Sequence, residues 1–251
     1  MRIDLTDFEE RTSQAVRAFW DTRAAAVERQ RLNGVIDQGE RAGVTSGKNM
    51  DGFVRLLADL VDLNGLPDAE LHMTRGVNTL PGYFRPTKDW DLLVLHHGVL
   101  IAALELKSQV GPSFGNNFNN RTEEAVGSAV DLWTAFREKA LGSQHAPFVG
   151  WLIHVEEAAG STRPVRVSEP HFDVFPELRN TSYLQRYEHL CRRLVLEKHY
   201  TEASLIVSTR EGGLQGEYGD LSEATSFRRF AIAFAAHIAR EALLLRGGGM
   251  G

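Results

Sequence analysis

The sequence has almost no cysteine and no long apolar run. Cys191 is the only cysteine among 251 residues, so no internal disulfide can form, which fits a reducing cytoplasm. No stretch approaches the roughly 20 apolar residues that a bilayer-spanning helix needs. The first residues carry acids where a secretory signal would have an apolar core. We therefore expect a cytoplasmic protein without a membrane partner.

Several catalytic motifs are also missing from the sequence. It has no glycine-rich phosphate loop before a helix, no Gly-x-Ser-x-Gly elbow and no paired cysteine motif. Positive charge is in slight deficit, with 28 Lys and Arg against 33 Asp and Glu, for a net charge of -5. This balance argues against a protein that coats nucleic acid nonspecifically, but an enzyme acting on DNA can combine central carboxylates with local basic contacts.

The remaining composition is that of a large globular protein. With 251 residues and 43% hydrophobic residues, we expect one elaborated α/β domain over residues 1–251. Apolar periodicity predicts helices at 6–31, 50–63, 120–141, 182–195 and 222–245, strands at 69–74, 147–155 and 203–208, and loops at 33–49, 75–88 and 157–177. Residues 50–155 then form an αβββαβ core: a central mixed sheet flanked by helices, with extra N- and C-terminal helices.

Two apolar runs within residues 87–109 are predicted to form a β-hairpin about residues 96–98. Gly98 can take the positive φ that closes a three-residue loop. Pairing Leu95 with Val99 across that loop sets the register of the two strands. A two-residue loop would reverse the parity of the side chains, so the prediction depends on the turn.

Alternation along this hairpin separates charged side chains from apolar ones. One face is expected to carry Asp89, Asp91, Ala103, Glu105 and Lys107, and the other Leu92, Val94, Leu100, Ala102, Leu104 and Leu106. The register places Asp89 opposite Glu105. The sequence therefore predicts a cluster of acids and one lysine at the end of the hairpin.

Such a cluster suits hydrolysis of a phosphodiester. Asp91 and Glu105 offer hard oxygens for Mg²⁺, and the carbonyl of Leu106 is a further candidate ligand. Lys107 would lie beside the attacking water and the phosphate, where it stabilises negative charge. The same residues could instead be ordinary solvated strand ends, because a Glu-x-Lys triplet alone is expected about once by chance. Pattern alone does not decide between the two.

Other charged residues nearby are weaker candidates. Asp89 could replace Asp91, and Glu70 could add a remote metal contact, although an outward polar position in a strand is the simpler interpretation. His72, His96 and His97 lack a third ligand at a spacing diagnostic of a transition metal. We expect the two turn histidines to be exposed, and Cys191 to be structural because it lies on the apolar side of its helix.

The runs KDWDLLVL and LIAALELKSQVGPSFGNNFNNRTEEAVGSAVDLWTAFRE closely resemble the XhoI family of type II restriction endonucleases, within the PD-(D/E)XK nuclease superfamily. The resemblance implies a Mg²⁺-dependent homodimer that cleaves both strands of duplex DNA within the palindrome CTCGAG and leaves 5′ overhangs. It also implies a companion methyltransferase that protects host DNA at the same site. It assigns the catalytic positions to Asp91, Glu105 and Lys107. No literal Pro-Asp pair is present, because the nearest proline is Pro86.

Candidate DNA contacts flank the predicted hairpin. They are Arg75, Arg85, Lys88, Asn116, Asn117, Asn119, Asn120 and Arg121, with Arg163 and Arg166 as weaker candidates for base recognition. For each asparagine alone, an ordinary turn or helix cap is the favoured interpretation. Two other functions stay open: a repair or junction nuclease of the same fold, and a non-catalytic DNA-binding protein with a nuclease fold.

Overall fold

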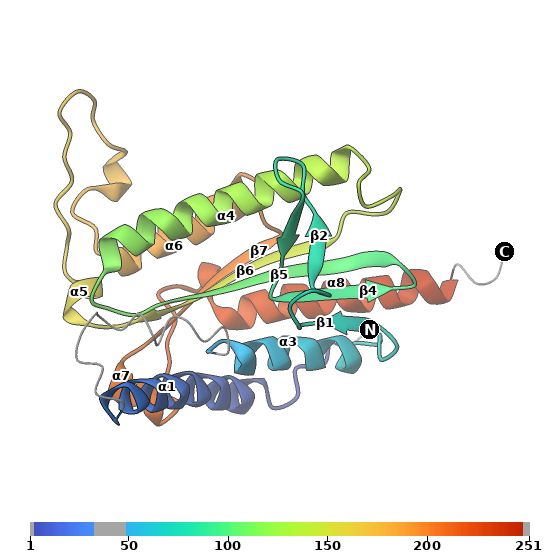
Figure 1. Cartoon of the computed structure of the whole chain (residues 1–251), viewed down its shortest axis with the longest axis horizontal. Helices are drawn as coiled ribbons and strands as arrows, with labels where there is room; N and C mark the ends of the chain where they lie inside the picture. The colour runs from blue at the N-terminus through green and yellow to red at the C-terminus, as the bar shows by residue number, and fades with distance from the viewer. Residues whose placement is uncertain (1–2, 33–48, 248–251) are drawn as a thin grey trace.

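A central five-stranded sheet organises the protein. A computed structural model describes residues 3–32 and 49–247 (Figure 1). In spatial order the strands are β1 (Glu70–His72), β4 (Leu92–His96), β5 (Val99–Gln109), β6 (Phe148–Glu156) and β7 (Glu202–Ser208). The pairs β1–β4 and β4–β5 are antiparallel, whereas the pairs β5–β6 and β6–β7 are parallel. The expected mixed sheet is therefore present.

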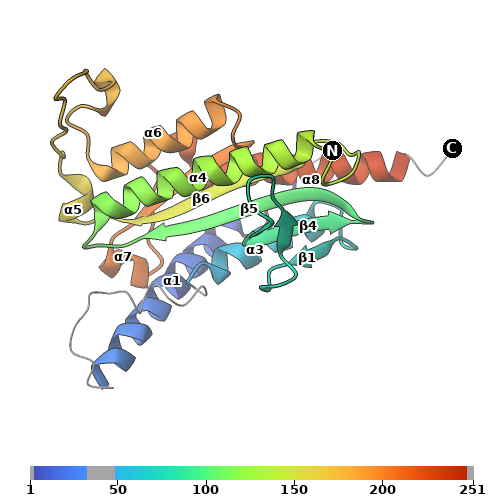
Figure 2. The ribbon, with the colours of Figure 1, turned by 45° about the horizontal axis from the view of Figure 1, so that its top comes forward.

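Helices cover both faces of the sheet (Figures 1 and 2). One face, called here the α8 face, packs against α1 (Phe8–Leu32), α3 (Asp51–Leu63) and α8 (Phe227–Gly247); the other, the α4 face, packs against α4 (Phe114–Arg137) and α6 (Tyr183–Leu196). Shorter helices are α5 (Ala159–Thr162), η1 (Pro176–Leu178), α7 (Arg210–Leu214) and η2 (Glu223–Thr225). The predicted architecture of a mixed sheet between helices is confirmed.

Each face has its own hydrophobic core. Phe53 and Phe234 are fully buried in the core of the α8 face, and Trp151 and Tyr187 in that of the α4 face. β6 is buried along its whole length, as expected for a strand covered by helices on both sides. Among residues 3–32 and 49–247, none of the helices has the length and apolar character that crossing a bilayer requires.

Local signals in the sequence set several helix boundaries. Before α6, the Ser182 hydroxyl accepts a hydrogen bond from the Gln185 N–H at 3.3 Å, and the Gln185 side chain accepts one from the Ser182 N–H at 2.8 Å. This capping box is the one the sequence predicts. The first helix, the helix at 51–63 and the last strand also lie where expected, while the loop predicted at 33–49 falls, except for Asn49, outside the described residues.

The predicted three-residue turn of the hairpin is wrong, but its parity survives. The turn has two residues, His97 and Gly98, both with positive φ, so half-buried His96 pairs with Val99. A short way beyond this turn, β5 has one residue more than β4: Ile101 has no partner in β4 and forms a bulge. The bulge offsets the shorter turn, so the faces beyond it are as predicted.

The bulge changes the faces only near the turn. Leu92, Val94, Ala102, Leu104 and Leu106 lie in the core of the α8 face, as predicted. Leu100 instead joins the core of the α4 face, and Ile101 takes its place on the α8 face. The charged residues therefore point toward α4.

The predicted loop at 75–88 contains a small second sheet. β2 (Thr79–Pro81) and β3 (Thr87–Asp89) pair antiparallel, and Asp89 pairs with Thr79 rather than lying opposite Glu105. Its glycines and prolines suggested a loop, yet Pro81 ends a strand where no N–H is needed. Figure 2 shows this hairpin standing over the sheet on the α4 side.

The asparagine-rich segment is helical, not a loop. α4 begins at Phe114, six residues before the predicted start at Asn120. Asparagine is a weak helix former, but packing overrides that preference: Phe114 is buried, with its ring 6.3 Å from that of Tyr183. The asparagines consequently lie on the first turns of α4.

Candidate active site

The start of β4 and the end of β5 bring the acids together. The Asp91 N–H donates to the Leu104 carbonyl at 3.1 Å, and the Leu106 N–H donates to Asp91 Oδ2 at 2.7 Å. These two bonds fix the Asp91 carboxylate beside the strand that carries Glu105. Asp91, not Asp89, is therefore the acid that adjoins Glu105.

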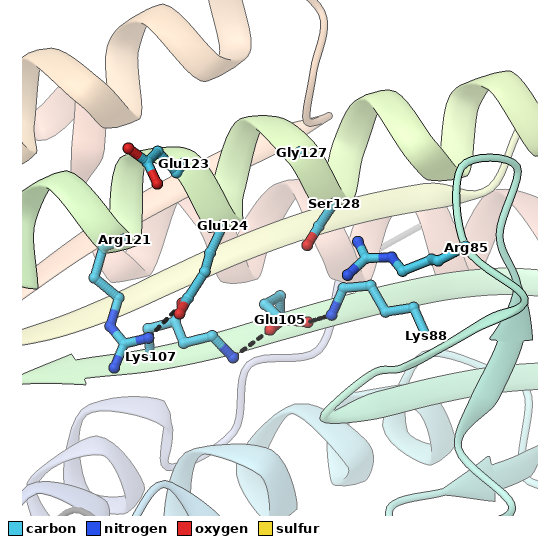
Figure 3. A pocket seen from close by; sticks show the side chains of 9 residues that line it. All are labelled: Arg85, Lys88, Glu105, Lys107, Arg121, Glu123, Glu124, Gly127 and Ser128. Carbon is cyan, nitrogen blue, oxygen red and sulfur yellow. Dashed lines mark hydrogen bonds and ion pairs between the residues drawn. The ribbon is translucent and has the colours of Figure 1, made fainter.

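Glu105 lies at the centre of a group of charges. Its side chain is 7% exposed, and Lys88 Nζ lies 2.6 Å from its Oε2 while Lys107 Nζ contacts its Oε1 (Figure 3). Lys107 Nζ is also 3.5 Å from Asp91 Oδ2. One ammonium thus contacts both carboxylates.

Burial and charge act differently on the three groups. Burial opposes the charge of Glu105, but Lys107 and Lys88 outweigh it and hold the pKa of Glu105 below its usual value. Partial burial, reinforced by the charge of Glu105, raises the pKa of Asp91. For Lys107, burial favours the neutral amine, but Glu105 and Asp91 prevail and raise its pKa. At neutral pH Lys107 is therefore a cation.

A cavity of about 360 Å³ opens above these groups, between β5 and α4 (Figure 3). Its lining residues are Arg85, Lys88, Glu105, Lys107, Arg121, Glu123, Glu124, Gly127 and Ser128. Arg121 forms an ion pair with Glu124, and its Nε is buried without a hydrogen-bond partner among the described residues. Four cations and three glutamates thus line this polar cavity, and its guanidinium and ammonium groups suit a phosphate group.

The carboxylates also suit a hard divalent cation. Lys107 shows that a positive charge is accommodated between Asp91 and Glu105, and the carboxylate oxygens are ligands that Mg²⁺ prefers. Residues 3–32 and 49–247 contain no cluster of three His, Cys, Asp or Glu that could hold a metal. Two carboxylates are nevertheless the number that Mg²⁺ commonly takes from a protein, so the residues fit.

The basic candidates are distributed unevenly about the site. Lys88 is held against Glu105 and is 12% exposed, so it belongs to the charged centre. Arg85 and Arg121 line the cavity. Arg75 is almost fully exposed, with its Nε 3.9 Å from Asp89 Oδ2. These positions separate cavity residues from a peripheral arginine.

Other candidates lie outside the cavity. Asn116, Asn119 and Asn120 are exposed on α4 and Asn117 is half-buried; none of them lines the cavity. Asp89 instead accepts a hydrogen bond from the Thr79 hydroxyl at 2.6 Å. Glu70 pairs in register with Leu95, away from Asp91, and lies 3.6 Å from His72. Arg163 and Arg166 are exposed in the segment between α5 and η1.

Sequence reasoning missed the contribution of α4. Ser128 and Asp131 are buried polar residues on the otherwise apolar stripe that includes Ala125 and Leu132. Ser128 lines the cavity, and Asp131 Oδ2 accepts a hydrogen bond from Arg85 Nε at 2.7 Å. A polar residue within an apolar helical stripe was the available signal.

Comparisons with known proteins give the family. Residues 29–220 match the family described as restriction endonuclease XhoI. The type II restriction enzyme BstVI of Geobacillus stearothermophilus is 48% identical over 214 residues, covering 83% of this chain and 95% of that protein. The type II restriction enzyme XhoI of Xanthomonas vasicola is 54% identical over 200 residues, covering 78% and 79% of the two chains. The type II restriction enzyme AbrI of Azospirillum brasilense is 55% identical over 172 residues, covering 68% and 77%.

No solved structure matches the chain. The family match spans most of the sequence, including the hairpin and α4, which together carry the charged cavity. This chain therefore belongs to the XhoI family of restriction endonucleases.

Proposed function

We propose that this protein cuts both strands of duplex DNA within CTCGAG, in a Mg²⁺-dependent reaction that leaves 5′ overhangs. The observation that carries the proposal is the pair of carboxylates, Asp91 and Glu105, which both contact Lys107; Glu105 and Lys107 also line a polar cavity that holds three further cations. Family membership supports DNA cleavage. The choice of CTCGAG rests on resemblance to the XhoI family.

Asp91, Glu105 and the Leu106 carbonyl would hold the Mg²⁺ ion. Bound there, the ion would neutralise the scissile phosphate and lower the pKa of a coordinated water so that hydroxide forms near neutral pH. Glu105 enters this role already ionised, since its pKa lies below the usual value. The Leu106 N–H keeps Asp91 oriented.

Lys107 acts as a cation in this scheme rather than as the general base. Its pKa is raised by Glu105 and Asp91 against the effect of burial, so it does not give up its proton at neutral pH. Its ammonium is placed to stabilise the negative charge that develops on the phosphate. Lys88, on the other oxygen of Glu105, adds to the same positive field.

The order of elements supports a PD-(D/E)XK core. Along the sheet the chain runs α3, β1, β4, β5, α4 and β6, which is the αβββαβ order, with the β2–β3 hairpin inserted before β4. We place the catalytic core at about residues 50–155 within one elaborated domain. The first and last helices then extend the α8 face.

DNA would approach from the α4 face, where the cavity opens. Arg85 and Arg121 are placed to contact phosphates there, with Arg75 at the periphery. The exposed asparagines of α4 remain candidates for base contacts. A palindromic target matches a two-fold symmetric homodimer, and a companion methyltransferase would act on the same DNA site as a separate protein.

Incubation of the protein with defined duplexes tests this function. One duplex contains CTCGAG, a second differs from it by one base pair, and a third is methylated within the site. With Mg²⁺ we expect two fragments with 5′ overhangs from the first duplex only, and no cleavage with EDTA. Equal cleavage of the first two duplexes, or no cleavage across a range of salt and divalent ions, would contradict the proposal.

A further inference from the structure

Two aromatic side chains project into solvent beside the cavity. The turn between β2 and β3 carries Tyr83, 54% exposed, and Phe84, 70% exposed. Their ring centroids are 5.0 Å apart in an edge-to-face arrangement. Two adjacent exposed aromatic rings present apolar surface that a partner can cover.

A buried carboxylate fixes this turn. Asp131 Oδ1 accepts hydrogen bonds from the Tyr83 N–H at 2.7 Å and the Phe84 N–H at 2.8 Å, and its Oδ2 accepts one from Arg85 Nε at 2.7 Å. The Asp131 side chain is only 4% exposed. Burying a carboxylate is unfavourable unless it is fully paired, and here its partners all belong to the turn. The protein thus uses a buried charge to hold two rings in solvent.

The turn is also sterically fixed. A Cβ on Gly82 would lie 2.6 Å from the Arg85 carbonyl oxygen and 2.6 Å from Asp131 Oδ2, so only glycine fits this close approach. The Gly82 N–H donates to the Pro86 carbonyl at 3.2 Å. The positions of Tyr83 and Phe84 are therefore set before any partner binds, which reduces the entropy lost on binding.

The neighbouring charges indicate what that partner is. Arg85, adjacent to Phe84, lines the cavity together with Lys88 and Lys107 (Figure 3). A polyanion that places one phosphate in this cavity extends past the turn. Duplex DNA offers phosphates to the cations and also the apolar faces of its sugars to the rings, whereas a second copy of this chain has a net charge of -5 and no such repeating anion.

We infer that Tyr83 and Phe84 pack against the sugars of the DNA duplex whose phosphate occupies the cavity, so that the β2–β3 turn is a DNA-contacting element. This inference rests on the proposed function. Contacts of aromatic rings with sugars require no particular sequence and neutralise no phosphate. They therefore add affinity without adding to the salt dependence of binding.

The test compares binding and cleavage by the wild-type protein and the double variant Tyr83→Ala/Phe84→Ala. Binding of a labelled duplex containing CTCGAG is measured by fluorescence anisotropy at several salt concentrations with Ca²⁺, and gels verify that the duplex stays intact. We expect the affinity to fall about tenfold, because the variant lacks the two rings whose apolar surface is buried against the DNA. The slope of log Kd against log salt should equal that of the wild type.

Two control variants isolate the effect of the rings at this turn. Tyr83→Phe/Phe84→Tyr keeps both rings and should retain wild-type affinity. Phe172→Ala removes a ring that is 88% exposed. The segment between α5 and η1 that carries it lies away from the β2–β3 hairpin in both views, so this variant should also leave affinity unchanged (Figures 1 and 2). Light scattering of each variant checks its oligomeric state, and circular dichroism checks its fold.

Wild-type affinity and cleavage rate in the Tyr83→Ala/Phe84→Ala variant would overturn the inference while leaving the proposed function intact. A smaller oligomer in that variant would also overturn it, by showing that the rings join two subunits. If the wild-type protein itself neither binds nor cuts the duplex, the proposed function fails and the inference fails with it. A wild-type protein that does not bind or cut the duplex therefore contradicts the proposed function, whereas a variant that behaves like an active wild type contradicts only the inference about the rings.

Discussion

The two faces of the sheet treat a buried ionisable side chain in opposite ways. On the α4 face, Glu105 is kept charged by Lys88 and Lys107. On the α8 face, fully buried His154 bonds to the Ser208 hydroxyl at 2.7 Å and packs 4.4 Å from the Phe19 ring. Burial, assisted by the charge of Arg23, lowers the pKa of His154 to about 3, so it is neutral.

The difference supports the proposal that the chemistry takes place on the α4 face. Packing accommodates a neutral imidazole with one hydroxyl partner and aromatic neighbours, while His154 Nδ1 is buried without a hydrogen-bond partner among the described residues. A buried carboxylate requires cations close by, and such pairs cost desolvation energy that packing does not return. What distinguishes Glu105 is that its lysines also face a polar cavity and that a second carboxylate, Asp91, contacts the same Lys107, which supports its proposed role in a reactive centre.

The largest expected effect on the charged α4 face is the loss of cleavage in Asp91→Asn. Removing one of the two carboxylates should lower the cleavage rate by at least about 10³-fold, since it removes a metal ligand and a partner of Lys107. Asp89→Asn is the matched control, because Asp89 faces Thr79 and Arg75 outside the cavity. Single-turnover cleavage measures both. Equal losses in the two variants would remove the distinction between these acids.

On the α8 face, buried His154 should make the free energy of unfolding depend on pH. The pKa of His154 is depressed from an unfolded value of 6.5 to about 3, so its neutral form stabilises the fold above pH 6.5 and this stability is lost as the pH falls toward 3. The slope from this group reaches about 1.4 kcal/mol in the free energy of unfolding per pH unit.

Urea unfolding between pH 7 and pH 4 measures that slope. His154→Gln should flatten it, and His145→Gln, at an exposed position, should leave it as in the wild type. An unchanged slope in His154→Gln would show that the buried histidine does not control acid unfolding. Cleavage at pH 7 should continue in both variants.

A smaller effect is expected for Lys88→Gln on the α4 face. Lys88 lowers the pKa of Glu105, so removing its charge should raise that pKa and move the acid limb of the cleavage rate to higher pH. The rate at neutral pH should fall by about tenfold, as one electrostatic contact is lost. Arg55→Gln, exposed on α3, is the control. Weaker DNA binding with an unshifted pH profile would assign Lys88 to phosphate contact instead.

The smallest expected effect is on thermal stability: neutralising Asp91 and neutralising Glu105 should change Tm in opposite directions. Burial raises the pKa of Asp91, so its charged form destabilises the fold at neutral pH, and Asp91→Asn should raise Tm at pH 7. The pKa of Glu105 is lowered, so its charge stabilises the fold above its unfolded pKa, and Glu105→Gln should lower Tm. Thermal unfolding at pH 7 measures both. Shifts of the same sign would contradict the assigned environments.

The sequence was sufficient for the architecture and for the acids because both depend on periodicity. Alternation placed Glu105 and Lys107 on one face, and this survived a wrong turn since the bulge at Ile101 offset the shorter loop. A bulge leaves no local signal in a run such as LIAALEL, so the register itself could not be predicted.

The remaining features depend on contacts distant in sequence. Lys88 was expected at a phosphate because nothing local shows that it reaches Glu105, 17 residues away. The clamp between Asp131 and the β2–β3 turn joins residues 46–48 positions apart. The asparagine run became helical through packing of Phe114, which propensity cannot anticipate.

The most direct test of a catalytic α4 face is Glu105→Gln, measured for cleavage and for binding on the same CTCGAG duplex. We predict no detectable single-turnover cleavage with Mg²⁺. We also predict DNA affinity with EDTA at least equal to that of the wild type, because a negative charge is removed beside the cations proposed to bind phosphate. Cleavage at the wild-type rate would contradict the assignment of Glu105 and would place the reactive centre elsewhere in the protein.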